Sequence, residues 1–125
     1  MRASDSDAAP RAGAGGRALI ARVEAHAGEA AALLKALGNE QRLLILCALL
    51  DGPRSVGEIN ARVPLSQSAL SQHLAVLRAA EVVTTRRESQ TIWYALAPGP
   101  AGRVMQALYE CYCAPPRRRR AATGN

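Results

Sequence analysis

The sequence predicts a mainly α-helical domain with a small β-hairpin, and three observations lead to this fold class. The chain has 125 residues, which is the size of one domain. Apolar residues make up 49% of it, but there is one Trp, there are three Tyr and there is no Phe. A core of Leu, Ile, Val and Ala favours helices. Apolar positions recur at helical spacing except in one stretch that resembles strands, so the expected order is four helices, two strands and a final helix.

The first two helices are predicted from apolar stripes. Residues 17–37 place apolar side chains three and four positions apart, as an amphipathic helix does. That stripe consists of Leu19, Val23, Ala27, Ala30, Leu34 and Leu37. Gly38 ends this helix, and Asn39 can cap the next one. The second stripe consists of Leu43, Leu46, Cys47 and Leu50. The turn residues Asp51-Gly52-Pro53 stop the second helix.

Two further helices follow with clear start signals. Ser55 and Glu58 have the spacing of a capping box, which opens a short helix through about residue 62. Pro64 breaks that pattern. Ser66 then caps a helix that runs to about residue 80, and a hydrophobic staple can form where it begins. The staple pairs Leu65 with Leu70, and the inward stripe is Leu70, Leu74 and Leu77.

A hairpin and a last helix complete the domain. Residues 82–87 are β-branched and basic, and residues 91–96 alternate, which predicts two strands joined by the loop 88–90. The alternation places Ile92, Tyr94 and Leu96 on one face. Residues 98–100 form a linker, and the last helix is predicted from Arg103 to about Cys113.

The two short helices and their tight turn make a helix-turn-helix candidate. If the leucine stripe of the second helix is buried, its opposite face is polar and can contact base edges or phosphates. The face consists of Gln67, Ser68, Ser71, Gln72, Ala75 and Arg78. A solvated helix face is the alternative, but Arg86 and Arg87 on the hairpin favour DNA because they are placed as a cationic wing. Gln90 in the loop belongs to the same DNA-contacting set, whereas His73 is interpreted as a structural, hydrogen-bonded residue.

The net charge of +6 is unevenly distributed. Residues 1–16 are net neutral and without periodicity, so we expect a disordered arm. Residues 17–114 carry ten basic and eight acidic residues, and Arg117 to Arg120 supply the remaining four positive charges. Residues 115–125 therefore predict a disordered basic tail. A basic chain favours nucleic acid as a partner, but the DNA prediction depends on the surface of the domain because most of the excess charge lies in the tail.

Several function classes are excluded by the composition. The longest apolar run, Leu43 to Leu50, falls far short of the ~18 residues that span a membrane. The first 30 residues have no apolar block typical of a signal peptide. We therefore expect a cytoplasmic protein with no membrane partner. Three cysteines are an odd count, which argues against a disulfide scaffold and leaves free thiols with a possible role.

Four segments resemble the ArsR–SmtB family of bacterial winged-helix repressors, and the resemblance covers about residues 33–113. The segments are LGNEQRLLIL (37–46), SVGEI (55–59), LSQSALSQHLAVL (65–77), which is similar to the family's recognition helix, and TTRRESQTIWYAL (84–96). The resemblance implies a winged helix-turn-helix domain over residues 17–114, dimerised through its first and last helices. It also implies a homodimer that represses by binding a double-stranded, palindromic DNA operator until a signal releases it.

The family's two metal sites are not matched by this sequence. One needs a Cys pair near residues 55–58, which is absent, and the other needs Asp, His and Glu ligands on the last helix, where Glu110 stands alone. We therefore expect no metal and no cofactor. Cys47 and Cys113 instead resemble the persulfide- and redox-responsive branch of the family, and the chain is also similar to its nodulation regulators. The resemblance implies that a sulfane-sulfur compound or another oxidant modifies Cys47 and Cys113.

Residue patterns alone leave the roles of the cysteines open. Cys47 by itself is more often a small core residue. Cys111 and Cys113 point roughly 200° apart on a helix, so only one of them can face Cys47, and spacing does not choose between them. The family resemblance selects Cys113, and we interpret Cys111 as dimer packing. The arginine tail can lower the pKa of Cys113, attract phosphate or simply aid solubility.

Three alternatives to a redox-switched repressor follow from the sequence. The first is a family member that senses a metal or another ligand, or that has no switch. The second is a small thiol enzyme for sulfur transfer or oxidoreduction, which we do not expect because the chain has no CxxC, no acid–base pair beside a Cys and no Gly-rich phosphate loop. The third is a winged-helix module that binds proteins and never contacts DNA.

Overall fold

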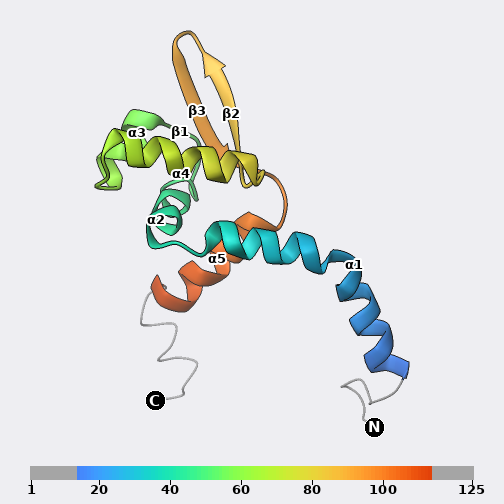
Figure 1. Ribbon diagram of the computed structural model, residues 1–125. Helices are drawn as coiled ribbons and strands as arrows, with labels where there is room; N and C mark the ends of the chain where they lie inside the picture. Colours follow the sequence, from blue (N-terminus) through green and yellow to red (C-terminus); the bar gives the residue numbers. More distant parts are fainter. Residues whose placement is uncertain (1–13, 114–125) are drawn as a thin grey trace, which may run out of the picture. The chain divides into compact units, whose positions relative to one another are not determined.

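A computed structural model describes residues 14–113 (Figure 1). The chain divides into two units, residues 1–34 and residues 35–125. The predicted basic tail and residues 1–13 of the predicted arm lie outside the described residues. No described helix is long and apolar enough to cross a membrane.

Helix α1 (Ala14–Leu37) begins three residues before the predicted start. The prediction placed residues 1–16 in a disordered arm because they show no periodicity, and it was wrong for residues 14–16, which belong to α1; helix ends are the least certain part of such predictions. The stripe is amphipathic as expected, but most of it faces outward: Leu19, Val23 and Leu34 are each more than half exposed.

Helices α2 (Glu40–Ala48) and α3 (Val56–Arg62) start at the predicted caps. The side-chain oxygen of Asn39 accepts a hydrogen bond from the Arg42 backbone N–H at 3.1 Å. Ser55 and Glu58 form both hydrogen bonds of the capping box, each at 3.2 Å. These bonds satisfy backbone donors that a helix start leaves unpaired, which explains why both starts can be read locally.

The predicted stripe of α2 was partly wrong. The buried residues of this segment are Ile45, Leu46 and Leu49, whereas Cys47 is exposed. Leucines occupy several adjacent positions here, so the periodicity fits more than one face of the helix. Cys47 therefore lies at the edge of the packed face, and its interpretation as a core residue is wrong.

Helix α4 (Gln67–Ala79) follows α3 after a short turn, as predicted. Ser66 Oγ caps it by accepting from the Ala69 N–H at 3.1 Å. The amide of Asn60 donates to the Val63 and Leu65 carbonyl oxygens at 3.3 and 2.9 Å, so a single side chain holds the turn. The inward stripe is confirmed, because Leu70, Leu74 and Leu77 are all buried.

A three-stranded antiparallel sheet has the order β1-β3-β2. Strands β2 (Val83–Glu88) and β3 (Thr91–Leu96) form the predicted hairpin, which projects from the body in Figure 1. Glu88 belongs to β2 and pairs with Thr91, so the loop is the two-residue turn of Ser89 and Gln90 rather than 88–90. Ser89 adopts a φ of 56°, in the left-handed region that tight hairpin turns require.

Strand β1 (Arg54–Ser55) was not predicted, because two residues carry no periodicity. It pairs with β3, with Arg54 opposite Tyr94 and Ser55 opposite Trp93. The alternation in β3 does not translate into one buried face. Every β3 residue from Ile92 to Leu96 is half-buried, since β3 is the central strand and both of its faces are partly covered.

Helix α5 (Pro100–Cys113) begins at Pro100, within the segment predicted as a linker. Proline is well suited to the first helical position, where its missing N–H would have no partner. Ala101 and Met105 are buried and anchor α5 in the hydrophobic core, whereas Tyr112 is 82% exposed. The remaining core residues are contributed by the other elements of the body: Ala36, Leu37, Ile59, Val63, Val82 and Val83.

Candidate nucleic-acid interface and paired cysteines

The outward face of α4 has the composition that the sequence predicted. The residues expected to contact DNA on this helix are all exposed: Gln67, Ser68, Ser71, Gln72 and Arg78. The opposite face is fixed by the three buried leucines. The helix therefore presents amide and hydroxyl groups on a rigid support, and such groups can hydrogen-bond to base edges in the major groove.

A hollow of ≈ 410 Å³ lies on this face where α4 meets α3 and β3. Ser71 and Arg78 line it, and so does Tyr94. Tyr94 was missed as a candidate contact because the alternation of β3 only grouped it on one face with Ile92 and Leu96. Tyr94 is half-buried at the hollow, and only the tertiary structure could reveal this position.

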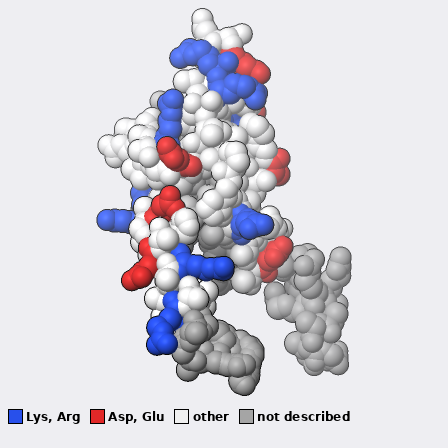
Figure 2. All heavy atoms as spheres, turned by 90° about the vertical axis from the view of Figure 1, so that its right-hand side faces the viewer, with Lys and Arg blue, Asp and Glu red and all other residues white. Residues whose placement is uncertain are grey.

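The hairpin carries the other predicted contacts. Arg86 and Arg87 are both exposed and, as neighbours on a strand, point to opposite faces. Arg86 Nη2 lies 3.1 Å from Glu88 Oε2, whereas Arg87 forms no salt bridge with another described residue. Figure 2 shows the basic side chains gathered at the projecting end of the hairpin, with acidic groups beside them. Gln90 lies in the exposed turn.

His73 is hydrogen-bonded, as expected. Arg42 Nη1 donates to His73 Nδ1 at 3.4 Å, and Arg42 Nε donates to the Ala36 carbonyl oxygen at 2.6 Å. Arg42 thus connects α2 with α4 and with the C-terminal end of α1. Within residues 14–113, no three His, Cys, Asp or Glu side chains gather in a way that could hold a metal ion.

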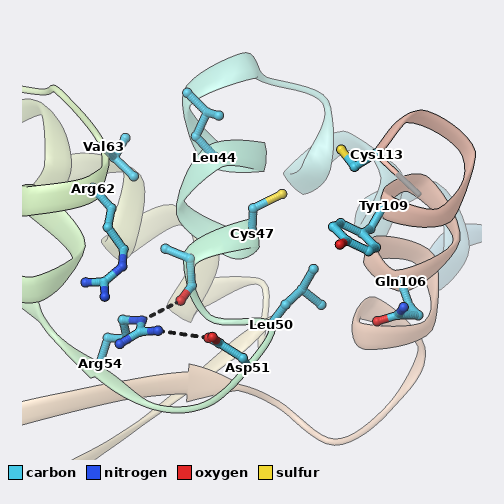
Figure 3. A pocket seen from close by; sticks show the side chains of 11 residues that line it. Leu44, Cys47, Leu50, Asp51, Arg54, Arg62, Val63, Gln106, Tyr109 and Cys113 are labelled. Atoms are coloured by element: carbon cyan, nitrogen blue, oxygen red, sulfur yellow. Dashed lines mark hydrogen bonds and ion pairs between the residues drawn. The ribbon is translucent and has the colours of Figure 1, made fainter. Parts of the chain in front are cut away.

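Cys47 and Cys113 line the same cleft, which is formed by α2, α3 and α5 and has a volume of ≈ 610 Å³. Figure 3 shows the two sulfur atoms directed toward each other from α2 and α5. Cys111 is exposed and is not among the residues that line the cleft. The tertiary structure therefore brings together the two cysteines that the family resemblance selected, a choice that helical spacing could not make.

The cleft changes the ionisation of Cys47. Cys47 is exposed at the cleft, but the surrounding side chains remove part of the water from its thiol; this desolvation raises the pKa of Cys47, and the nearby Cys113 raises it further because two thiolates repel each other. Cys47 is therefore mostly a protonated thiol at neutral pH and reacts slowly as a first nucleophile. The proposed effect of the Arg117 to Arg120 tail on Cys113 lies outside the described residues.

These features define a class of protein. Two short helices with a fixed turn, a polar exposed face on the second helix and a basic hairpin beside it form a winged helix-turn-helix of the DNA-binding type.

Comparisons with known proteins identify the family. Residues 39–85 match the family model described as "Bacterial regulatory protein, arsR family". The chain is 50% identical to the transcriptional activator HlyU of Vibrio cholerae over 91 residues, which are 73% of this chain and 84% of that protein. It is 47% identical to the biofilm growth-associated repressor of Agrobacterium fabrum over 93 residues, or 74% and 80% of the two chains. The chain therefore belongs to the ArsR family of DNA-binding transcriptional regulators, which are not enzymes.

A solved structure agrees with this assignment. The structure of reduced HlyU from Vibrio cholerae superposes with a TM-score of 0.70 and 49% sequence identity. The match covers 74% of this chain and 97% of that one. At this level of identity the winged helix-turn-helix fold and the family are both established.

Proposed function

We propose that this protein is a homodimeric repressor that binds a palindromic operator and is released when Cys47 and Cys113 are oxidised to a bridge. The observation that carries this proposal is the meeting of the two thiols in one cleft between α2 and α5. A protein named as a biofilm growth-associated repressor is among the similar proteins. A transcriptional activator is also among the similar proteins.

The proposed DNA contacts lie on α4 and the hairpin. Gln67, Ser68, Ser71 and Gln72 face the major groove, with amides able to pair bidentately with adenine. Arg78, at the far end of α4, contacts phosphate. Arg86, Arg87 and Gln90 on the hairpin approach the minor groove, where cations are favoured. All these side chains are exposed, and Arg86 is the one that also forms a salt bridge with Glu88.

The homodimer is proposed from apolar surface on the first and last helices. On α1, Leu19, Ile20 and Val23 are more than half exposed. On α5, Tyr109 and Tyr112 are 43% and 82% exposed. Covering such side chains with a second copy removes apolar surface from water, which stabilises the dimer. Two copies can then place two recognition helices about one DNA turn apart, as a palindromic operator requires.

The proposed switch is a two-step thiol reaction. The Cys113 thiolate attacks the outer sulfur of a persulfide, R–S–SH, which gives Cys113–S–SH and releases the thiol RSH. Cys47 then attacks the inner sulfur of that persulfide and releases H₂S, leaving a Cys47–Cys113 disulfide. The two cysteines are oxidised by two electrons, and the sulfane sulfur is reduced to sulfide. If both cysteines carry an extra sulfur when they react, the same displacement leaves a trisulfide.

The bridge would affect DNA binding through α2. This helix packs against α3, α4 and α5, so it contacts both the DNA-reading helices and the helix assigned to the dimer. A covalent link from Cys47 to Cys113 fixes α2 against α5. The reading helices would then lose the spacing that the operator requires, because α2 carries them.

The test is an operator-binding titration with the mass of the intact protein recorded in each sample. Wild type, Cys47→Ser and the matched control Cys111→Ser are compared, each reduced and polysulfide-treated, on an operator selected from random DNA. Wild type and Cys111→Ser are expected to lose about tenfold or more in affinity on treatment, a normal size for coupling between two sites. Cys47→Ser should keep its affinity. Release of Cys47→Ser from DNA by polysulfide contradicts the proposed switch.

A further inference from the structure

The cleft that holds Cys47 and Cys113 has the size of a ligand site. Its volume of ≈ 610 Å³ is within the range of about 300–1,000 Å³ typical of small-molecule pockets. Besides the two cysteines and Tyr109, the lining consists of four apolar residues and four residues with charged or amide side chains. The apolar residues are Leu44, Ala48, Leu50 and Val63, and the polar ones besides the cysteines and Tyr109 are Asp51, Arg54, Arg62 and Gln106.

Arg54 has a structural role, because its guanidinium is bonded to residues at the end of α2. Its Nε donates to the Ala48 carbonyl oxygen at 2.8 Å, and its Nη2 lies 2.9 Å from Asp51 Oδ1. The side chain of Arg54 is 21% exposed. Asp51 balances its charge, so this pair fixes the end of α2 and leaves no net charge in the cleft.

Arg62 is the other cationic residue that lines the cleft, and its charge is not balanced by a carboxylate of the lining. Its Nη1 donates to the Glu58 carbonyl oxygen at 3.1 Å, and no described carboxylate lies within salt-bridge distance of it. The Glu58 carboxylate, one turn away, is engaged in the capping box with the Ser55 N–H. With the thiols neutral, the side chains that line the cleft therefore carry a net charge of +1, located on Arg62.

The charge and the thiols lie at different sides of the cleft. In Figure 3, Arg62 and Arg54 are on one side, Cys113 and Tyr109 are on the other, and Cys47 lies between them. A guanidinium binds a carboxylate through paired N–H donors, and Arg62 has donors to spare. The arrangement fits a molecule with a carboxylate at one end and a reactive sulfur at the other.

We propose that the cleft binds a small persulfide that bears a carboxylate, with Arg62 holding the carboxylate and the outer sulfur lying at Cys113. This inference rests on the proposed function and adds the chemical class of the effector. The Cys113 thiolate forms a bond to the outer sulfur as the bond between the outer sulfur and the carrier sulfur breaks. The carrier leaves as a thiolate, and no electrons are gained or lost in this transfer. Arg62 is a positioning residue that selects the carrier.

The first experiment compares two persulfides of similar size on the full-length reduced protein. Glutathione persulfide carries carboxylates, and the persulfide of glutathione diethyl ester does not. Arg62→Gln is expected to slow the reaction of Cys113 with glutathione persulfide about fivefold, the upper end for an exposed ion pair. Its reaction with the ester should be unchanged. Arg62→Lys should recover part of the rate, and Arg103→Gln, an exposed arginine of α5 outside the cleft, should match wild type.

The second experiment uses S-methylglutathione, which cannot react with a thiol. It should slow the alkylation of Cys47 and Cys113 by neutral iodoacetamide, followed for each cysteine by mass spectrometry. Cys111 lies outside the cleft, so its alkylation is the internal control. Arg62→Gln should abolish the protection of Cys47 and Cys113.

The outcomes separate the carboxylate site from the switch. If Arg62→Gln slows both persulfides equally, or if S-methylglutathione protects no cysteine, the carboxylate site is wrong even where polysulfide still releases the protein from DNA. If S-methylglutathione protects Cys47 and Cys113 in wild type but not in Arg62→Gln, the site stands. A failure of oxidation to release DNA would then count against the proposed switch alone.

Discussion

The DNA-reading part of this molecule and its thiol cleft are built in opposite ways. The reading head, which comprises α3, α4 and the β2–β3 hairpin, gathers its proposed contacts on surfaces that are continuous in sequence. Beneath α4, Leu70 and Leu77 are fully buried. The cleft instead joins residues from α2, α3 and α5, and Leu44 on its wall is half exposed.

The difference matches the two tasks that we propose. Base recognition depends on side chains held in fixed positions, so the reading head needs a tightly packed support. A site for a small effector must admit it, so the cleft stays open to solvent. Two thiols on different helices can also respond to a chemical change that joins those helices, which neighbouring residues on one helix could not do.

The largest expected effect tests the packing side of this comparison. Leu77→Ala should lower the free energy of unfolding by about 2–5 kcal/mol, because it removes a fully buried side chain and leaves a cavity. Leu44→Ala, on the cleft wall, should cost less than about 1 kcal/mol, because Leu44 is 50% exposed. Urea denaturation of both variants measures these values. Equal losses would show that the cleft is packed as tightly as the core, and the proposed difference in packing between the two regions would be wrong.

The next effect concerns specificity in the reading head. Gln72→Ala should weaken operator binding by about 1–3 kcal/mol, the discrimination that one bidentate base contact supplies. Binding to random DNA at the same salt concentration should change little. Gln41→Ala is a matched control, since Gln41 is exposed on α2 and outside the proposed interface. An equal loss of affinity for operator and for random DNA would indicate that Gln72 contacts a phosphate rather than a base.

The smallest effect concerns the cleft and depends on pH. The raised pKa of Cys47 means that its thiolate fraction is low at neutral pH, so its alkylation by iodoacetamide should speed up about tenfold per pH unit until pH reaches that pKa. Cys113→Ser removes the weaker of the two causes. The pKa of Cys47 should then fall but stay above the ordinary value, because burial is the larger cause. A pKa at the ordinary value in this variant would mean that burial contributes little.

Much of the fold could be predicted because its signals are local. The side chains of Asn39, Ser55 and Ser66 each accept a hydrogen bond from the backbone N–H three residues further on, so these caps can be recognised without the rest of the chain. The leucines of α4 were equally clear because Leu70, Leu74 and Leu77 recur at the spacing of one helix face. The three-residue error at the start of α1 and the misplaced start of α5 both fall at glycine or proline positions, where propensity and observed structure differ most.

Other features could not be predicted because distant contacts decide them. Strand β1 exists only through its pairing with β3. The buried face of α2 depends on which of several leucines meet α4 and α5. The position of Tyr94 beside Ser71 and Arg78 follows from the packing of the sheet against α4.

By itself, the sequence determined the order of the five helices and the hairpin, the turn between α3 and α4, the polar face of α4 and the family resemblance. These depend on periodicity and capping, which residues close together in the sequence determine. Only the tertiary structure decided that Cys47 is exposed, that it shares a cleft with Cys113 and not with Cys111, and that Arg62 brings an unbalanced charge to that cleft. Those properties depend on how separate helices pack, and packing is a relation between residues far apart in the chain.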